Sequence, residues 1–269
     1  MQGRPTWVSA PERSWPDERG LRLTIVIPFR DREDNLAELL PALHEYFLAG
    51  ARPRRLPPPR VCVVEQDDRA LFNKGMLCNI GFDIHQHELD AVCFHDVDCI
   101  PVDVDYSHPD RPARLIEVGT RNKEDLEVFF GAVVATSRED FRRVNGFSNG
   151  YLRWGFEDHD LLLRFVRNGY TLEARRGVFR ALVHRPHERD DRGQVQPEVI
   201  ANRDRFRRRF DAPGPFWIGD GLDDLRYRVV DTRLLSPASG ATLEVLHHRV
   251  QFGPPAQAEP AARDPIPGA

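Results

Sequence analysis

The chain has 269 residues, of which 41% are hydrophobic and 30% are charged, and its formal net charge at pH 7 is −4. These values are typical of a folded globular protein. They argue against a broad nucleic-acid-binding surface, because contacts with many phosphates need a clustered excess of Lys and Arg. They also argue against a transmembrane helix, since nowhere do eighteen apolar residues follow one another.

The N-terminus and the cysteines bear on where the protein works. Residues 1–20 contain no apolar stretch of the kind found in signal peptides and membrane anchors, which predicts a cytoplasmic location and is compatible with a peripheral contact with a membrane. The cysteines show no Cys-x-x-Cys spacing and fall in or beside segments expected to be buried: Cys62, Cys78, Cys93 and Cys99. Buried free thiols are the preferred interpretation, although an even number also allows a disulfide. No feature indicates the oligomeric state.

The first part of the chain alternates predicted strands and helices. Residues 21–32 form an apolar, β-branched run that predicts a buried parallel strand, and residues 36–47 carry apolar side chains at helical spacing. A strand over 60–66, a helix over 73–84 and a third strand over 91–101 follow. This β-α-β-α-β order predicts a mostly parallel sheet with ligands bound beyond the carboxyl ends of its strands.

The second part predicts further elements of both kinds. Residues 128–137 are expected to form another buried strand, followed by a helix that Ser137 begins as cap and Gly146 ends. An amphipathic helix is predicted over 156–169 and a β-hairpin or edge pair within 220–250. Residues 193–206 are compatible with either a helix or a loop.

These elements predict an α/β fold organised as one domain. The domain is expected to span residues 21–250, between a flexible N-terminal segment of residues 1–20 and a disordered, Pro- and Ala-rich tail of residues 251–269. The single basic cluster, residues 203–209, is interpreted as the solvated face of a helix.

An acidic triplet, Asp96-Val97-Asp98, stands at the predicted end of the third strand. A divalent cation prefers carboxylate oxygens and can take its other ligands from the phosphates of a nucleotide. Alternation along an extended chain would place both carboxylates on one side and Val97 on the other. Acidic pairs are also common in loops, so the triplet alone is a weak signal.

A second acidic group opens the helix predicted over 156–169. Glu157 and Asp158 there need no function to explain them, because negative charges in the first turn complement the helix dipole. The dipole does not explain the preceding glycine-rich and aromatic stretch, in which Tyr151 and Trp154 are expected to be exposed beside the carboxylates. Aromatic faces next to acids suit a sugar, whose C–H face stacks while its hydroxyls donate hydrogen bonds.

Two histidines, His184 and His187, lie three residues apart in a polar segment. In a turn this spacing allows both imidazoles to bind one ion, whereas in a straight strand they face opposite ways. Exposed histidines without a ligand are an equally good interpretation of the spacing alone.

Taken together in chain order, these motifs resemble the beta-1,4-galactosyltransferase family (glycosyltransferase family 7) over roughly residues 21–250. The resemblance implies a GT-A fold, that is, a Rossmann-like and mostly parallel sheet flanked by helices, with a small C-terminal β-hairpin. The segments that carry it are IPFRDR (27–32), FNKGMLCNIGF (72–82), FHDVDCIP (94–101), residues 129–160, and DGLDDLRYRVVD (220–231).

The resemblance implies a role for each of several residues. Asp158 would be the catalytic base, and the donor or acceptor sugar would contact Glu157, Trp154, Gly155, Phe129 and Tyr151. The nucleotide would contact Pro28, Phe29, Arg30, Arg32, Phe72, Asp96 and Val97. The metal, Mn²⁺, would be bound by Asp98, His187 and His184.

Three positions depart from the family pattern. His184 stands where the family often has a methionine ligand, which implies a harder ligand and an altered preference among manganese and its neighbours. Phe156 replaces the usual second glycine of its motif, and His159 replaces an acid; both changes bear on the shape of the acceptor site.

The predicted function is therefore metal-dependent, inverting transfer of galactose from UDP-galactose to a carbohydrate or glycoconjugate hydroxyl, forming a beta linkage. Phe129 stands where galactose-transferring members carry tyrosine, and its bulk favours galactose over N-acetylgalactosamine. A related transferase of N-acetylgalactosamine or glucose, and a non-catalytic module that binds nucleotide sugars or glycans, are the alternatives. Identity of the acceptor is not indicated.

Overall fold

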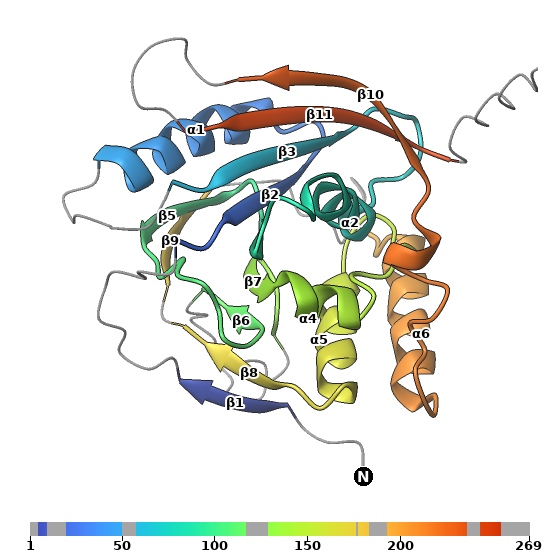
Figure 1. Cartoon of the computed structure of the whole chain (residues 1–269). Helices are drawn as coiled ribbons and strands as arrows, with labels where there is room; N and C mark the ends of the chain where they lie inside the picture. The colour runs from blue at the N-terminus through green and yellow to red at the C-terminus, as the bar shows by residue number, and fades with distance from the viewer. Residues whose placement is uncertain are drawn as a thin grey trace, which may run out of the picture.

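The structure of the protein, a computed structural model, describes residues 5–9, 20–49, 58–116, 129–175, 177–182, 193–235 and 243–253. Its centre is a twisted nine-stranded sheet (Figure 1). The strands are β1 (Thr6–Ser9), β2 (Leu23–Phe29), β3 (Arg60–Gln66), β4 (Ala91–His95), β6 (Ala113–Arg114), β7 (Val133–Ser137), β8 (Thr171–Ala174), β10 (Tyr227–Leu234) and β11 (Val245–Phe252). Their order across the sheet is β1-β8-β6-β7-β4-β2-β3-β11-β10.

Most neighbouring strands in this sheet run parallel, as predicted. Within the described ranges, β2 pairs in parallel with β3 and β4, β3 with β11, and β8 with β1 and β6. The pairs β4–β7, β6–β7 and β10–β11 are antiparallel. The last of these is the predicted C-terminal hairpin, and β11 joins it to the parallel part of the sheet.

The prediction of one continuous strand over 91–101 is wrong. The chain leaves the main sheet after β4, turns over residues 96–98, and begins β5 (Cys99–Asp103), which pairs only with β9 (Val178–Ala181) in a separate two-stranded sheet. The N–H of Cys99 donates to the carbonyl oxygen of Asp96 at 3.3 Å. The acidic triplet therefore lies in a turn, and this turn, rather than strand alternation, directs its two carboxylates.

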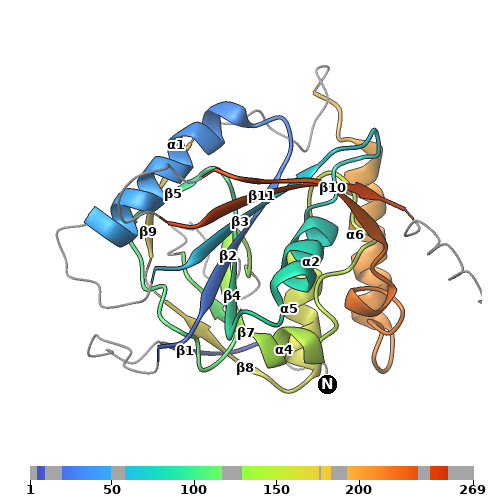
Figure 2. The ribbon, with the colours of Figure 1, turned by 45° about the horizontal axis from the view of Figure 1, so that its top comes forward.

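Helices cover both faces of the sheet. The helix α1 (Glu33–His44), which continues in a π-helical turn (Glu45–Ala49), lies on one face, and α2 (Lys74–His85), α4 (Arg138–Arg143) and α5 (Glu157–Arg167) lie on the other (Figures 1 and 2). Since side chains alternate along a strand, Ile25 and Ile27 of β2 pack in the core on the α1 side and Val26 packs on the α2 side.

The predicted helix starts agree with the caps that the structure shows. Asn73 accepts a hydrogen bond from the N–H of Met76 at the start of α2, and Ser137 accepts one from the N–H of Asp140 at the start of α4. Such caps satisfy backbone donors that have no partner within the helix. Gly146 follows α4 with a φ of +65°, the left-handed conformation typical of a helix end.

The predicted boundaries of the domain need two corrections. Thr6–Ser9 forms β1, which pairs with β8, so these four residues of the predicted flexible segment belong to the sheet. At the other end, β11 extends to Phe252, two residues into the predicted tail. Residues 254–269 lie outside the described residues.

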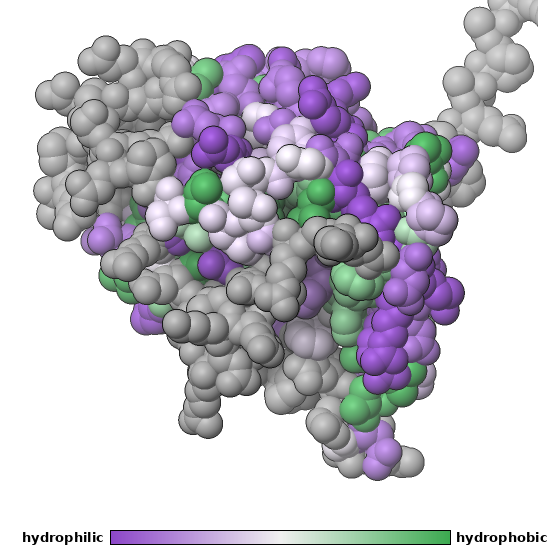
Figure 3. All heavy atoms as spheres, turned by 90° about the horizontal axis from the view of Figure 1, so that it is seen from below, coloured by the Kyte–Doolittle hydropathy of each residue, from purple (hydrophilic) through white to green (hydrophobic). Residues whose placement is uncertain are grey.

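The helix α6 (Pro197–Asp211) packs against α5. Viewed from below, the side of the molecule where α6 lies is largely hydrophilic with a few hydrophobic patches (Figure 3). Arg203, Arg207 and Arg208 are exposed as predicted, but Arg209 is not, because its side chain turns inward to pair with Asp160 at 2.7 Å.

All four cysteines are buried free thiols, as predicted. In the portion of the chain that the structure describes, every helix is too short or too polar to cross a membrane.

Candidate active site

Three separate parts of the chain meet around the side chain of Lys74, the first residue of α2. Its ammonium lies 3.0 Å from Asp96 in the turn after β4, 3.5 Å from Glu157, and 3.1 Å from Asp158, the last two being the first residues of α5. The Lys74 side chain is only 15% exposed. Two acidic motifs sixty residues apart in the sequence are thus bridged by one cation.

The electrostatics of this cluster follow from its burial. Burial lowers the pKa of the Lys74 ammonium, but the three carboxylates raise it by more, so its pKa lies well above the usual value. Burial raises the pKa of the Asp158 carboxyl to about 8; Lys74 opposes this rise, while Glu157 and Asp96 add to it. Burial therefore outweighs the helix dipole, which by itself favours the ionised carboxylate.

Asp98 lies in the same turn as Asp96, directly before β5. Its carboxylate is 3.6 Å from the Cys99 sulfur, and its backbone carbonyl accepts a hydrogen bond from the N–H of Leu182 at 2.8 Å. Leu182 ends a described stretch two residues before His184 in the sequence. His184 and His187, the predicted imidazole ligands, lie outside the described residues.

A close backbone approach holds Asp158 from the side of β7. A Cβ atom at Gly131 would lie 2.3 Å from Oδ2 of Asp158 and 2.9 Å from its Cγ. Only glycine leaves room for the carboxylate at this point. Ala132, the next residue, has a φ of +60°, so the backbone here is held in a left-handed conformation that most residues avoid.

We expect Gly131→Ala to reduce kcat by about 100-fold, because the added methyl group must displace Asp158 and a shift of about 1 Å in a catalytic group has effects of that size. UDP binding in the presence of manganese should change by less than a few fold, since the predicted nucleotide residues lie on other elements. Steady-state kinetics and calorimetric titration on the same preparation measure the two quantities. Unaltered turnover would show that the close approach has no functional role.

A buried ion network fixes the start of α5. Asp160 pairs with Arg164 at 2.7 Å and with Arg209 of α6 at 2.7 Å, and Arg164 also approaches Asp220 at 3.4 Å. Asp160 and Arg164 are fully buried. Because both partners of each pair are present, the network holds the helix turn that carries Glu157 and Asp158 without leaving a charge unpaired.

The two predicted aromatic contacts, Tyr151 and Trp154, both lie in the loop before α5 but differ in exposure. Trp154 is 41% exposed and available to a ligand. Tyr151 is 3% exposed, and its hydroxyl donates to Asp160 at 2.9 Å, so the expectation that it is exposed is wrong. Asn202 of α6 holds the loop by donating to the carbonyl oxygens of Leu152 and Trp154 at 2.8 and 3.1 Å.

Four of the predicted nucleotide residues lie in the last part of β2 or just beyond it. Pro28 and Phe29 are buried within that strand, and Arg32 immediately precedes α1. Arg30 donates to the carbonyl oxygen of Ala70 at 2.7 Å, and its guanidinium lies 5.6 Å from the centre of the Phe72 ring. This contact brings Arg30 and Phe72, two of the residues predicted to contact the nucleotide, next to each other.

The remaining predicted residues occupy intermediate positions. Phe129 is half-buried, and its carbonyl oxygen accepts a hydrogen bond from Arg114 at 2.9 Å. Val97 packs against the core on the α1 side, away from the cluster. Gly155 has a φ of +97° and open space around its Cα.

Comparison with known proteins adds to this geometry. Residues 9–108 match the family model described as the N-terminal region of glycosyl transferase group 7, and residues 118–188 match the model described as the N-terminal domain of galactosyltransferase. The chain belongs to the beta-1,4-galactosyltransferase family. Rat beta-1,4-galactosyltransferase 4 is 32% identical over 217 residues, which are 78% of this chain and 59% of that protein. Human beta-1,4-galactosyltransferase 1 is 29% identical over 218 residues, 79% of this chain and 52% of that protein.

The chain thus spans between half and two thirds of the length of these two relatives. Among solved structures, it resembles the catalytic domain of Drosophila beta-1,4-galactosyltransferase 7 with a TM-score of 0.68 and 23% identity. The match covers 87% of this chain and 94% of that domain. The fold is GT-A, as predicted.

Family membership makes the departure at Phe156 informative. This residue caps α5 with a φ of +73°, in the left-handed region that favours glycine. Phe156 keeps the backbone conformation that a glycine would adopt most easily, and its ring packs against those of His159 and Phe206, 5.5 and 5.7 Å away between centres. Two of the three departures from the family pattern, Phe156 and His159, therefore pack against each other.

Lys74 and Gly131 are the site residues that sequence reasoning missed, although each carried a signal. A lysine at the first position of a helix opposes the helix dipole, and a glycine inside a buried strand run weakens the strand. Each choice goes against local preference, which is a mark of functional positions.

Proposed function

We propose that this chain is an inverting, metal-dependent glycosyltransferase that transfers galactose from UDP-galactose to a hydroxyl of a carbohydrate or glycoconjugate, forming a beta linkage. The observation that carries the proposal is the position of Asp158: a carboxylate that is only 19% exposed, at a helix start, joined through Lys74 to an aspartate of the acidic triplet. Family membership gives that geometry its chemical context.

The names of the relatives support the donor and the metal. The curated relatives are called beta-1,4-galactosyltransferases. A second structure of the Drosophila protein, 22% identical to this chain, is described as a mutant in complex with manganese, UDP-Gal and xylobiose. We therefore assign UDP-galactose as donor, manganese as metal and a sugar hydroxyl as acceptor to this chain.

In the proposed reaction, the acceptor oxygen attacks the anomeric carbon from the face opposite UDP, which inverts the configuration. Asp158 accepts the proton of that hydroxyl, and the electron pair of the broken C–O bond leaves with the diphosphate. Lys74 orients Asp158 by holding both of its oxygens, at 3.3 and 3.1 Å. Glu157 and the exposed Trp154 are positioned to bind the sugars.

The residues around the acidic triplet fit a divalent ion. Asp98 offers a carboxylate oxygen. In the sequence, His184 and His187 follow within five residues of Leu182, whose N–H bonds to the carbonyl oxygen of Asp98. This mixture of oxygen and nitrogen suits manganese and its neighbours. When bound, the ion would neutralise the charge that builds on the departing diphosphate.

Replacing Asp98 by Ala should abolish metal-dependent donor binding while leaving the fold intact. The lost carboxylate is the predicted oxygen ligand of the metal, whereas Asp96 still pairs with Lys74. Calorimetric titration with UDP in the presence and absence of manganese measures the effect. UDP affinity that keeps its full dependence on manganese would exclude Asp98 as a ligand.

The pH dependence of the reaction should report Asp158. A general base must be ionised, and the pKa of this carboxyl is raised to about 8, so kcat/KM should fall about tenfold per pH unit below that value. The acid limb of kcat should report the same carboxyl in the complex with donor and metal. Profiles measured from pH 5.5 to 8.5 test this, and two flat profiles would exclude it.

The choice of donor rests on Phe129 and can be tested directly. A panel of UDP-galactose, UDP-N-acetylgalactosamine and UDP-glucose, with released UDP as readout, should favour UDP-galactose. Metal-stimulated hydrolysis of UDP-galactose without acceptor separates an enzyme from a module that only binds.

A further inference from the structure

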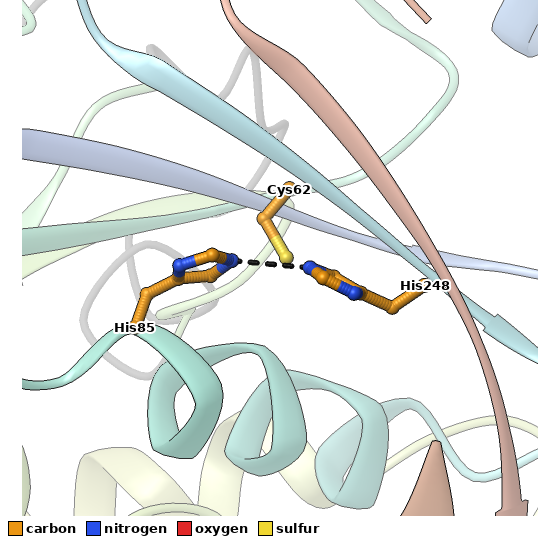
Figure 4. A group of neighbouring side chains, drawn as sticks. All are labelled: Cys62, His85 and His248. Atoms are coloured by element: carbon orange, nitrogen blue, oxygen red, sulfur yellow. Dashed lines mark hydrogen bonds between the residues drawn. The ribbon is translucent and has the colours of Figure 1, made fainter. Parts of the chain in front are cut away.

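A second cluster of metal-binding side chains lies away from the candidate active site. Cys62 of β3, His85 at the end of α2 and His248 of β11 point toward one another, with the sulfur facing the gap between the two rings (Figure 4). One donor atom from each residue lies within 4.8 Å of the other two. Cys62, His85 and His248 are 0%, 4% and 5% exposed, respectively.

The fold places these three residues together from distant parts of the chain. His248 is paired across the sheet with Val64, two residues from Cys62, so both side chains project from the same face. That face is the one α2 covers, and His85 is the last residue of α2. The cluster is therefore part of the rigid core between sheet and helix.

The spacing of the two imidazole nitrogens is compatible with a shared metal ion. The Nε2 atoms of His85 and His248 are 3.2 Å apart. Two imidazole nitrogens on a tetrahedral zinc ion are about 3.3 Å apart, given metal–nitrogen distances of about 2.0–2.1 Å. Two imidazoles and a thiolate are ligands that select zinc over the oxygen-preferring manganese or magnesium.

The opposite edge of each ring faces an oxygen atom, closely in His248 and more distantly in His85. Nδ1 of His248 lies 2.8 Å from the hydroxyl of Thr232, which can accept its proton. Nδ1 of His85 lies 3.6 Å from the Glu88 carboxylate, beyond hydrogen-bond length, and 3.4 Å from the Arg60 guanidinium, which can only donate. Metal-binding histidines typically give their second N–H to such an oxygen, which leaves Nε2 free for the ion.

We propose that Cys62, His85 and His248 form a structural binding site for a zinc ion. The ion would join the last turn of α2 to β3 and β11. The same helix begins with Lys74, eleven residues or about 16 Å away, so the site would fix the helix that positions the catalytic cluster. This inference does not depend on the proposed reaction.

Cobalt provides the first test, because a thiolate bound to Co²⁺ gives a charge-transfer band in the near ultraviolet. The full chain, stripped with a chelator and kept in excess magnesium, should bind about one equivalent of Co²⁺ with this band, and zinc should displace it. The band should vanish in Cys62→Ser and persist in Cys99→Ser. Cys99 is the matched control, because its sulfur lies beside Asp98 in the candidate active site.

Zinc affinity and thermal stability provide the second test. Zinc at about 100 times its Kd should raise the thermal midpoint of the wild type by about 5–10 °C, with a similar rise in His247→Asn but none in His248→Asn. If the ligand variants fail to fold, Thr232→Val keeps all three ligands and should lower zinc affinity by about 10–100-fold.

The proposal is overturned if the wild type gives no thiolate band with cobalt and gains no stability with zinc. It is equally overturned if the band survives Cys62→Ser and disappears in Cys99→Ser, because the bound ion would then lie in the candidate active site.

Discussion

Replacing Asp158 by Asn is expected to reduce kcat by about 10³-fold or more while changing donor affinity by less than a few fold. The amide has nearly the same shape as the carboxylate but cannot take a proton from the acceptor, and general bases typically contribute 10²–10⁴-fold. Lys74 keeps Asp96 and Glu157 as partners in the variant, so the nucleotide side of the site should remain in place. UDP release with a saturating acceptor, together with UDP titration, measures both quantities.

The stability of the same variant separates a catalytic loss from a folding defect. A carboxyl whose pKa is about 8 when folded and about 4 when unfolded binds more protons in the folded state between these values. Its contribution to stability is therefore present at low pH and is lost as the pH rises from about 4 to 8. Asn does not titrate, so the variant should be at least as stable as the wild type at pH 8.

Asp204→Asn, on the exposed surface of α6, is a suitable control and should leave kinetics and stability unchanged. Turnover within tenfold of the wild type in Asp158→Asn would remove Asp158 from the role of base.

Lys74→Met is expected to lower the free energy of unfolding by about 3 kcal/mol or more at pH 8, because it leaves three largely buried carboxylates without their cation. Their side chains are 11–30% exposed, so solvent screens the charges only partly. Donor binding should also weaken, since Asp96 loses the partner that holds it. Lys74→Arg keeps the charge and should lose much less stability.

The loss in Lys74→Met should depend on pH in a definite direction. Without the ammonium, the pKa of Asp158, which burial already raises, rises further, so the folded variant binds extra protons as the pH falls. The variant should therefore recover much of its stability at pH 5 and be least stable above pH 8. Urea unfolding at both pH values tests this, and a destabilisation independent of pH would show that Lys74 acts through packing alone.

Much of the fold could be predicted because local signals and tertiary contacts agree. The β2 strand is apolar on both faces because it is central and covered by helices on each side, and caps at Asn73 and Ser137 begin helices where the sequence indicates them. The prediction failed at Asp96–Asp98, where an apolar run continues through two strands that belong to different sheets. Periodicity cannot register this turn, because Cys99 and Ile100 are buried again immediately afterwards.

The site was less predictable from sequence for a physical reason. Tyr151 looks like an exposed aromatic in a glycine-rich stretch, yet its hydroxyl donates to Asp160 of α5, a carboxylate that also pairs with Arg209 of α6. Lys74 and Gly131 lie 84 and 27 positions from Asp158 in the sequence, and no local pattern links them to it. The sequence predicts the chemistry of single residues, whereas the contacts between them depend on the fold.

The position of manganese in crystals grown with UDP tests the proposed site most directly. We expect an anomalous manganese peak about 2.0–2.3 Å from a carboxylate oxygen of Asp98 and from an imidazole nitrogen of His187, with the diphosphate on the same ion. Asp158 should face the space beyond the diphosphate, where the sugar would lie. Manganese bound elsewhere, with Asp98 and His187 too far apart to share one ion, would contradict the proposed enzyme site.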